Sequence, residues 1–203
     1  MTTIIFVRHG QSKANVLDRL NSNPKYKYGL TELGKKQAES AAKEIRKINV
    51  SRIVASPLER AKQTAEILNA GLGLNIEVDD RIIEIKMGGM EGKSCKEGRW
   101  YFELGERKLK KLKVESWAHL EHRVNDFMDS LSDYKGAVVA VSHEDTIRAA
   151  ISSILGLGRY ELLGMAIKNG SLTAISHSEE GYKLWGASMP CIPKNMLAKI
   201  KMP

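Results

Sequence analysis

Two residue types that could bind and attack a phosphoryl group stand together near the N-terminus. Arg8 and His9 directly follow the apolar residues 4–7, and Gly10 comes next. A guanidinium group binds phosphate through two parallel hydrogen bonds, and a neutral imidazole can attack phosphorus as a nucleophile. Gly10 would let the backbone pass close to the phosphate or the ring, because it has no side chain.

Three residues further along the chain could complete such a site. Arg60 would add a second guanidinium group, and His143 would add a second imidazole. A departing alkoxide needs a proton, for which the carboxyl group of Glu84 is a candidate. A bound phosphate would raise the pKa of Glu84, because like charges disfavour ionisation. The same carboxylate could then activate water.

None of these residues indicates an active site by itself, since a lone arginine, histidine or glutamate is more often a surface or capping residue. The sequence has neither a GxxxxGK[ST] motif nor a GxGxxG motif after a strand, so side chains would have to hold the phosphate. We expect no metal site, because the sequence has no HExxH motif and no Cys/His ligand spacing.

Strands and helices that alternate along the chain would bring these residues to one edge of a sheet. Apolar runs predict strands at residues 4–7, 52–56, 75–78, 137–141 and 172–176. Helices are predicted to begin at Thr31, at Ser56-Pro57, near Trp117 and at Thr146. This alternation indicates an α/β domain with a largely parallel sheet, in which ligands bind beyond the carboxyl ends of the strands.

Composition bears on the class of partner. The chain has 203 residues and a formal net charge of +8, and residues 93–113 hold eight Lys/Arg against three Glu. Only 6% of residues are aromatic, which leaves little for stacking on bases, so we expect no nucleic-acid partner. The N-terminus does not resemble a signal peptide, no apolar run reaches the ~20 residues of a membrane span, and two cysteines suit a reducing cytoplasm. We therefore expect a cytoplasmic protein without a membrane partner.

Five sequence blocks occur in order along the chain: FVRHGQSKAN, LTELGKKQA, SPLERAKQTAEIL, IIEIKMGGMEG and VSHEDTIRAAI. Together they closely resemble the histidine phosphatase superfamily, the phosphoglycerate mutase-like family, from about residue 3 to residue 176. The resemblance implies a three-layer α/β fold with a mixed, mostly parallel sheet flanked by helices. It also implies a single histidine phosphatase-type domain over residues 1–203, with an inserted basic segment around residues 87–113 near the active site.

The resemblance also implies roles for individual residues. His9 would be the nucleophile that becomes phosphorylated, and Glu84 would be the proton donor. The other site residues would surround the phosphate: Arg8, Arg60 and His143 complete the pocket, and Gln11 and Asn15 line it. The family uses no metal, and the implied partner is a small phosphorylated metabolite. A homodimer is left open.

The blocks also bear on whether the reaction is hydrolysis or transfer. The sequence MGGMEG at residues 87–92 looks like the phosphatase-type sequence after the acid, although Met90 stands where Trp is common. Ile85-Lys86-Met87 replaces the Arg-His-Tyr signature of bisphosphoglycerate-dependent mutases, and the chain is shorter than typical mutases. The favoured function is therefore hydrolysis of small phosphomonoester metabolites through a phosphohistidine intermediate, with no cofactor.

Three alternatives stay open. The first is a phosphoglycerate mutase that depends on 2,3-bisphosphoglycerate as its cofactor. The second, from another class, is an anion- or nucleic-acid-binding protein that uses the basic segment. The third is a protein-phosphohistidine phosphatase with an open pocket. Glu144 and Asp145 stand where the family often has small residues and would oppose multiply charged substrates, whereas the basic segment would attract them.

Overall fold

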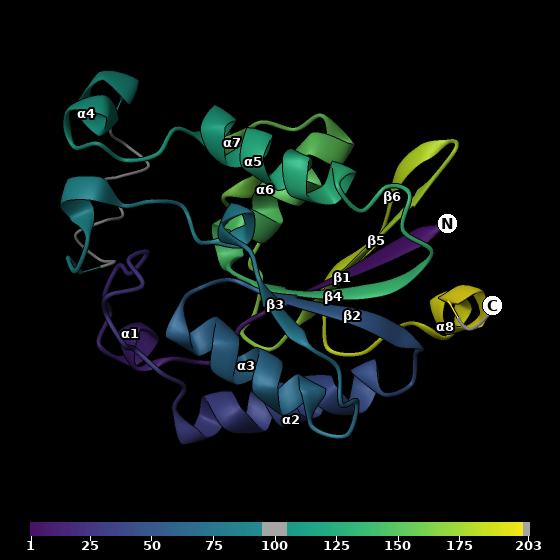
Figure 1. Cartoon of the computed structure of the whole chain (residues 1–203). Helices are drawn as coiled ribbons and strands as arrows, with labels where there is room; N and C mark the ends of the chain where they lie inside the picture. Colours follow the sequence, from purple (N-terminus) through teal and green to yellow (C-terminus); the bar gives the residue numbers. More distant parts are fainter. Residues whose placement is uncertain (95–104, 201–203) are drawn as a thin grey trace.

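A six-stranded sheet forms the centre of the molecule. The computed structural model describes residues 1–94 and 105–200, so part of the predicted basic segment lies outside the described residues. The strands lie in the order β3-β2-β4-β1-β5-β6 (Figure 1). Their bounds are β1 Thr2–Arg8, β2 Val50–Ala55, β3 Ile76–Val78, β4 Gly136–Ser142, β5 Leu172–Ser178 and β6 Gly181–Met189. Strands β3, β2, β4 and β1 run parallel, β5 pairs antiparallel with β1, and β6 pairs antiparallel with β5, which confirms the predicted mixed, mostly parallel sheet.

Both faces of the two central strands are buried, which explains their unbroken apolar sequences. Strands β1 and β4 pair in parallel from Thr2 with Gly136 to Arg8 with Ser142. Along β1, Ile4 and Phe6 pack into one apolar cluster, and Ile5 and Val7 pack into the other. Because successive side chains of a strand point to opposite faces, one run of apolar residues supplies both cores.

Helices cover each face of this sheet, as Figure 1 shows. One face carries α2 (Glu32–Ile45) and α3 (Glu59–Asn69), and the other carries α5 (Trp117–Asp129) and α6 (Glu144–Leu155). The shorter helices are α1 Lys13–Val16, α4 Glu106–Lys111, α7 Arg159–Leu162 and α8 Lys194–Ile200, with 3₁₀ turns η1 Asp80–Ile82 and η2 Gly88–Met90. Among the described residues, every helix is too short or too polar to cross a bilayer.

Three sequence predictions about these elements were wrong or incomplete. The helix predicted to begin at Thr146 begins two residues earlier, at Glu144. The helix predicted to begin at Ser56-Pro57 begins at Glu59, with Leu58 at the N-cap position. The reason is that the Ser56 hydroxyl accepts from the Leu58 backbone N–H at 3.3 Å and also bonds the His143 ring, so it shapes a turn before the helix. Strand β6 was missed, because it is a partly exposed edge strand with irregular pairing to β5.

A close contact between two backbones fixes the loop after β1. A Cβ atom on Gly10 would lie 2.2 Å from the Gly34 carbonyl oxygen, and one on Gly34 would lie 2.0 Å from the Gln11 carbonyl oxygen. Both distances are far below van der Waals contact, so only glycine fits at either position. The segment after His9 therefore rests directly on the first turn of α2.

Candidate active site

The parallel pairing of β1 and β4 brings two histidines together. His9 follows β1 and donates its backbone N–H to the Ser142 carbonyl oxygen at 3.0 Å. His143 follows β4 and is the N-cap residue of α6. The two rings are buried with their centroids 5.1 Å apart. Two strand ends that are far apart in sequence thus present their imidazoles at one edge of the sheet.

The guanidinium group of Arg60 lies between these two rings. Arg60 is in the first turn of α3 and is only 5% exposed. Its Nε donates to His9 Nε2 at 2.8 Å, and one terminal nitrogen lies 3.1 Å from His143 Nδ1. An arginine has donors and no acceptor, so the facing nitrogen of each imidazole must accept.

These contacts define the tautomer of His9. Its Nδ1 lies 2.7 Å from the Gly10 carbonyl oxygen, which can only accept, so Nδ1 carries the proton. The lone pair is therefore on Nε2, where Arg60 donates. Burial, together with the charges of Arg60 and Arg8, holds the pKa of His9 well below its ordinary value. His9 is a neutral ring whose Nε2 is free of a proton and available as a nucleophile.

His143 has the opposite tautomer. Its Nδ1 accepts from Arg60, so its Nε2 carries the proton and donates to the Ser56 hydroxyl at 2.7 Å. Burial, and then the charge of Arg60, lowers the pKa of His143 well below its ordinary value. Ser56, predicted as a helix cap, instead orients this second ring.

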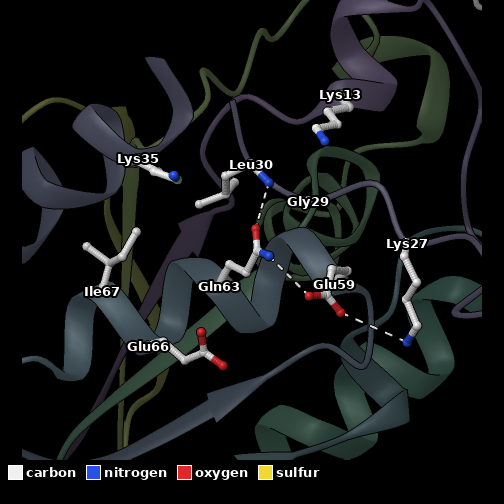
Figure 2. Close-up of a pocket in the computed structure, with 9 residues that line it drawn as sticks. All are labelled: Lys13, Lys27, Gly29, Leu30, Lys35, Glu59, Gln63, Glu66 and Ile67. Atoms are coloured by element: carbon white, nitrogen blue, oxygen red, sulfur yellow. Dashed lines mark hydrogen bonds and ion pairs between the residues drawn. The ribbon is translucent and has the colours of Figure 1, made fainter. Parts of the chain in front are cut away.

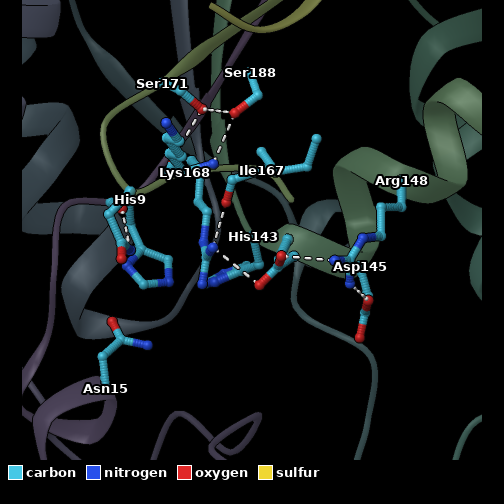
Figure 3. A network of polar contacts seen from close by, with 12 residues as sticks. His9, Asn15, His143, Asp145, Arg148, Ile167, Lys168, Ser171 and Ser188 are labelled. Atoms are coloured by element: carbon cyan, nitrogen blue, oxygen red, sulfur yellow. Dashed lines mark hydrogen bonds and ion pairs between the residues drawn. The ribbon is translucent and has the colours of Figure 1, made fainter. Parts of the chain in front are cut away.

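Arg8 is held by a chain of ion pairs that continues to Arg148 and Asp145, both labelled in Figure 3. One terminal nitrogen lies 2.9 Å from a Glu144 carboxylate oxygen and also donates to the Ile167 carbonyl oxygen. Arg148 in turn binds both Glu144 and Asp145, each at 2.8 Å. The two carboxylates that follow His143 are therefore paired with arginines, which reduces the repulsion they would exert on an anion.

Glu84 lies just after the 3₁₀ turn η1, partly buried and close enough to Arg8, Arg60 and Asp145 to feel their charges. Burial and the nearby Asp145 carboxylate raise its pKa to about 7, against the smaller opposing effects of the arginines. The backbone that carries Glu84 is fixed by donors from three elements: Ser142 Oγ to Ile82 O at 2.8 Å, Thr146 Oγ1 to Ile83 O at 2.8 Å, and Arg123 to Glu84 O at 3.2 Å.

The two residues expected to line the pocket behave differently. Asn15 is drawn below His9 in Figure 3, and its Oδ1 accepts from the backbone N–H and hydroxyl of Ser12 at 2.9 and 3.0 Å. The side-chain oxygen of Gln11 accepts instead from the Thr31 hydroxyl at 2.9 Å, at the N-cap of α2. The Asn15 oxygen is thus bound within the loop after His9, whereas the Gln11 oxygen is bound at the start of α2.

Sequence reasoning missed several residues that hold this group together. Asn21 accepts from two nitrogens of Arg60, at 2.6 and 3.0 Å, and Asn169 donates to the His9 carbonyl oxygen at 2.9 Å. Thr64 accepts from the Gly10 backbone N–H at 3.1 Å. Only Thr64 had a usable signal, because it follows Arg60 by four residues on one helix face. Asn21 and Asn169 come from loops, where no periodicity indicates what a side chain will contact.

A separate hollow of about 490 Å³ lies along the outer side of α3 (Figure 2). Its lining mixes lysines such as Lys13 and Lys27 with Glu59 and Glu66, and it includes none of the five residues predicted to be catalytic. Gln63 there accepts from the Leu30 backbone N–H at 2.7 Å and so ties the preceding loop to α3. The mixed charge of this hollow does not favour an anion.

The sequence profile of the "Histidine phosphatase superfamily (branch 1)" matches residues 4–187. The chain belongs to this superfamily. The match spans all six strands except the first two residues of β1 and the last two of β6, and it includes every residue of the site described above.

Similar proteins in the superfamily include both mutases and phosphatases. A 2,3-bisphosphoglycerate-dependent phosphoglycerate mutase from Thermoplasma acidophilum is 35% identical over 182 residues, covering 86% of this chain and 87% of the relative. The structure of Bacillus stearothermophilus YhfR matches with a TM-score of 0.81 at 22% identity, over 93% of this chain and 98% of that chain, which shows the shared fold. A mycobacterial glucosyl-3-phosphoglycerate phosphatase matches with a TM-score of 0.77 at 26% identity, over 92% and 98% of the two chains. The protein is a histidine phosphatase superfamily enzyme, either a phosphatase or a mutase.

The opposite tautomers of the two histidines can be measured directly. At pH 6, nitrogen-15 NMR should find both rings neutral, with the proton of His9 on Nδ1 and that of His143 on Nε2, because Arg60 donates to the other nitrogen of each ring. An Arg60→Met variant, which has no donor, should lose the fixed assignment of His143, whose other partner is the Ser56 hydroxyl, whereas His9 should keep its Nδ1 proton on the Gly10 carbonyl oxygen. Detection of protons on both nitrogens of either ring at pH 6 in the unaltered enzyme would contradict the assigned geometry.

Proposed function

We propose that the chain hydrolyses small phosphomonoesters through a phosphohistidine formed on His9. The observation that carries this proposal is the neutral His9 ring, whose unprotonated Nε2 faces the Arg60 guanidinium group. A nucleophile and a cation that stabilises a phosphoryl group are then in the same place. The Nε nitrogen of Arg8 gives further support, because it is buried without a hydrogen-bond partner among the described residues, and a phosphate oxygen would satisfy it.

In the first step, His9 Nε2 attacks phosphorus and the bond from phosphorus to the ester oxygen breaks. Arg60 transfers its N–H hydrogen bond from Nε2 to a phosphoryl oxygen, and Arg8 and Arg60 balance the phosphoryl charge. The leaving oxygen takes a proton from Glu84, whose pKa of about 7 keeps much of the carboxyl group protonated near neutral pH. The phosphorylated ring keeps its Nδ1 proton on the Gly10 carbonyl oxygen.

In the second step, water attacks the phosphoryl group and the bond from phosphorus to His9 Nε2 breaks. Glu84 is now a carboxylate and takes a proton from that water. Inorganic phosphate leaves, His9 is again neutral, and Glu84 is again protonated. One carboxyl group therefore serves as acid and then as base, so its intermediate pKa suits both steps.

The surroundings of Glu84 favour hydrolysis of a monoester over transfer from a bisphosphate. A mutase cofactor with two phosphates would need cations for the second phosphate. Arg123 beside Glu84 is bound by the buried Glu115 carboxylate at 2.8 Å, and Arg148 is bound by Glu144 and Asp145. Met87 has an uncharged side chain and adds no cation to this side of the site. The pairing of these two arginines with carboxylates leaves them less able to bind a second phosphate, which supports the proposal of hydrolysis.

Phosphoglycerate mutase activity is the second candidate. The Thermoplasma acidophilum relative, at 35% identity, carries that name and depends on 2,3-bisphosphoglycerate. The first half-reaction would be the same in both cases. The outcome depends on whether water or a substrate hydroxyl receives the phosphoryl group from His9.

Phosphorus-31 NMR separates the two candidates. The enzyme is incubated with 3-phosphoglycerate, with and without 2,3-bisphosphoglycerate, and His9→Ala serves as the control that lacks the nucleophile. We expect free phosphate to appear without the bisphosphate, and the control to form none. Formation of 2-phosphoglycerate only when the bisphosphate is present would instead establish the mutase. A fully active His9→Ala variant would contradict both candidates.

The role of Glu84 predicts a pH dependence that differs between substrates. An alkyl phosphate needs a proton on its leaving oxygen, whereas p-nitrophenyl phosphate has a good leaving group and needs it less. Glu84 is protonated below its pKa of about 7 and ionised above it, so the ratio of kcat/KM for the alkyl substrate to that for the aryl substrate should fall as pH rises through about 7. Taking the ratio cancels ionisations that both substrates share.

In Glu84→Gln the alkyl phosphate should lose roughly 10²- to 10⁴-fold in kcat/KM, with a much smaller loss for the aryl substrate. The substrate ratio in this variant should no longer change with pH. Equal losses for the two substrates would exclude Glu84 as the acid.

A further inference from the structure

The carboxylate of Glu91 accepts hydrogen bonds from three consecutive residues, 21–23, of a loop that is distant in sequence. Glu91 follows the 3₁₀ turn η2. It accepts from Asn21 Nδ2 at 3.1 Å, from the Ser22 backbone N–H at 2.9 Å, from the Ser22 hydroxyl at 2.6 Å and from the Asn23 backbone N–H at 3.2 Å. Such a set of donors holds a carboxylate, and the loop around it, in one arrangement.

The same loop holds Arg60. The Asn21 side-chain oxygen accepts from Arg60 at 2.6 Å, and the Asn21 backbone carbonyl accepts from it at 3.0 Å. Asn21 is thus bound at both ends of its amide, with the NH₂ group on Glu91 and the oxygen on Arg60. The amide has only one productive orientation, because a flip would turn its NH₂ group toward a guanidinium group and its oxygen toward a carboxylate.

We infer that Glu91 is a positioning residue for phosphoryl transfer at His9, acting through Asn21 and Arg60. This inference rests on the proposed function, since it concerns the same phosphohistidine chemistry. The Glu91 carboxylate orients the Asn21 amide, and the amide oxygen in turn fixes the guanidinium group of Arg60. The guanidinium group is then held with its Nε donating to His9 Nε2. The path from Glu91 to the nucleophile consists of three hydrogen bonds through side chains.

The charge of Glu91 has a second effect on Arg60. Burial lowers the pKa of Arg60 to about 10, and the charges of Glu84 and Glu91 oppose that effect. A buried cation near the cationic Arg8 needs such compensation to keep its proton. Glu91 therefore supports both the orientation and the charge of the group that faces His9.

A purely structural role for Glu91 can be distinguished from this one. The loop and the segment after η2 are also joined by backbone hydrogen bonds, from Gly92 N to Leu20 O at 2.8 Å and from Leu20 N to Lys93 O at 2.9 Å. The Ser22 hydroxyl accepts from the Met87 backbone N–H at 2.9 Å. These bonds do not involve the Glu91 side chain, so its substitution should leave the two segments joined.

The test is a double-mutant cycle of Glu91→Gln and Asn21→Ala with p-nitrophenyl phosphate as substrate and orthovanadate as inhibitor. Glutamine is isosteric but turns an NH₂ group toward the loop donors. Each single variant should lose about 10- to 100-fold in kcat/KM, as removal of a supporting partner commonly does, and vanadate should bind more weakly. The double variant should lose no more than the worse single variant, because both substitutions break one path.

Glu77→Gln is the matched control. Glu77 lies on the edge strand β3, and its carboxylate is paired at 2.6 Å with Arg52 of the neighbouring strand β2 and with none of the site residues. The Glu77→Gln variant should have the kcat/KM of the unaltered enzyme. The Glu77→Gln/Glu91→Gln double variant should have the same kcat/KM as Glu91→Gln alone. Restoration of part of the activity in Glu91→Asp, which keeps the charge, would support the positioning role further.

Two results would overturn the inference. One is a folded Glu91→Gln enzyme with unchanged kcat/KM and vanadate affinity, and the other is a double variant whose losses multiply. If Glu91→Gln does not fold, Asn21→Ala alone tests the same path, since it removes the amide that joins Glu91 to Arg60, and unchanged kcat/KM and vanadate affinity in that variant would again overturn the inference. Phosphohistidine on the unaltered enzyme should be trapped by base quenching, because it is stable in base and labile in acid. If no phosphohistidine is found, the proposed function is contradicted. If it is found but the Glu91 and Asn21 variants keep normal kcat/KM, only the role of Glu91 is contradicted.

Discussion

The buried guanidinium group of Arg60 donates to His9, to His143 and to Asn21 at once. Burying a charge costs several kcal/mol unless its donors are satisfied and opposite charges lie near. Here the donors are satisfied by groups that only accept in this geometry, and Glu84 and Glu91 supply the compensating charge. The cost of burying Arg60 therefore constrains every group around it: the tautomers of two histidines, the orientation of one amide and the placement of two carboxylates.

The fold supports this arrangement from several directions. Parallel pairing of β1 with β4 sets His9 and His143 side by side, and the close contact of Gly10 with Gly34 holds the following loop on α2. Arg60 comes from a helix that packs its apolar face on the same sheet. The proposed chemistry thus takes its three central groups from the ends of two strands and from a helix, while loops supply the partners that orient them.

How much of the fold and of the site could be predicted from the sequence depended on whether each residue belongs to a strand, a helix or a loop. The apolar runs before His9 and before His143 showed that both histidines follow buried strands, and the parallel pattern placed them at one sheet edge. Arg60 was predictable as a member of the site only together with the other blocks, because one helical arginine has no distinctive pattern. The start of α3 was placed too early, since Ser56 looked like a helix cap and in fact bonds His143. Asn21, Glu91 and Asn169 could not be found, because contacts between loops depend on the completed tertiary structure.

The central claim is that His9 Nε2 receives the phosphoryl group while Arg60 stabilises it. A crystal structure of the enzyme with orthovanadate tests this most directly, since vanadate adopts the geometry of a phosphoryl group under attack. The account predicts vanadium bonded to His9 Nε2, the Arg60 Nε hydrogen bond moved onto a vanadate oxygen, and the Glu84 carboxyl group beside the oxygen opposite the histidine. Vanadate held without a bond to His9, or bound away from Arg60, would contradict it.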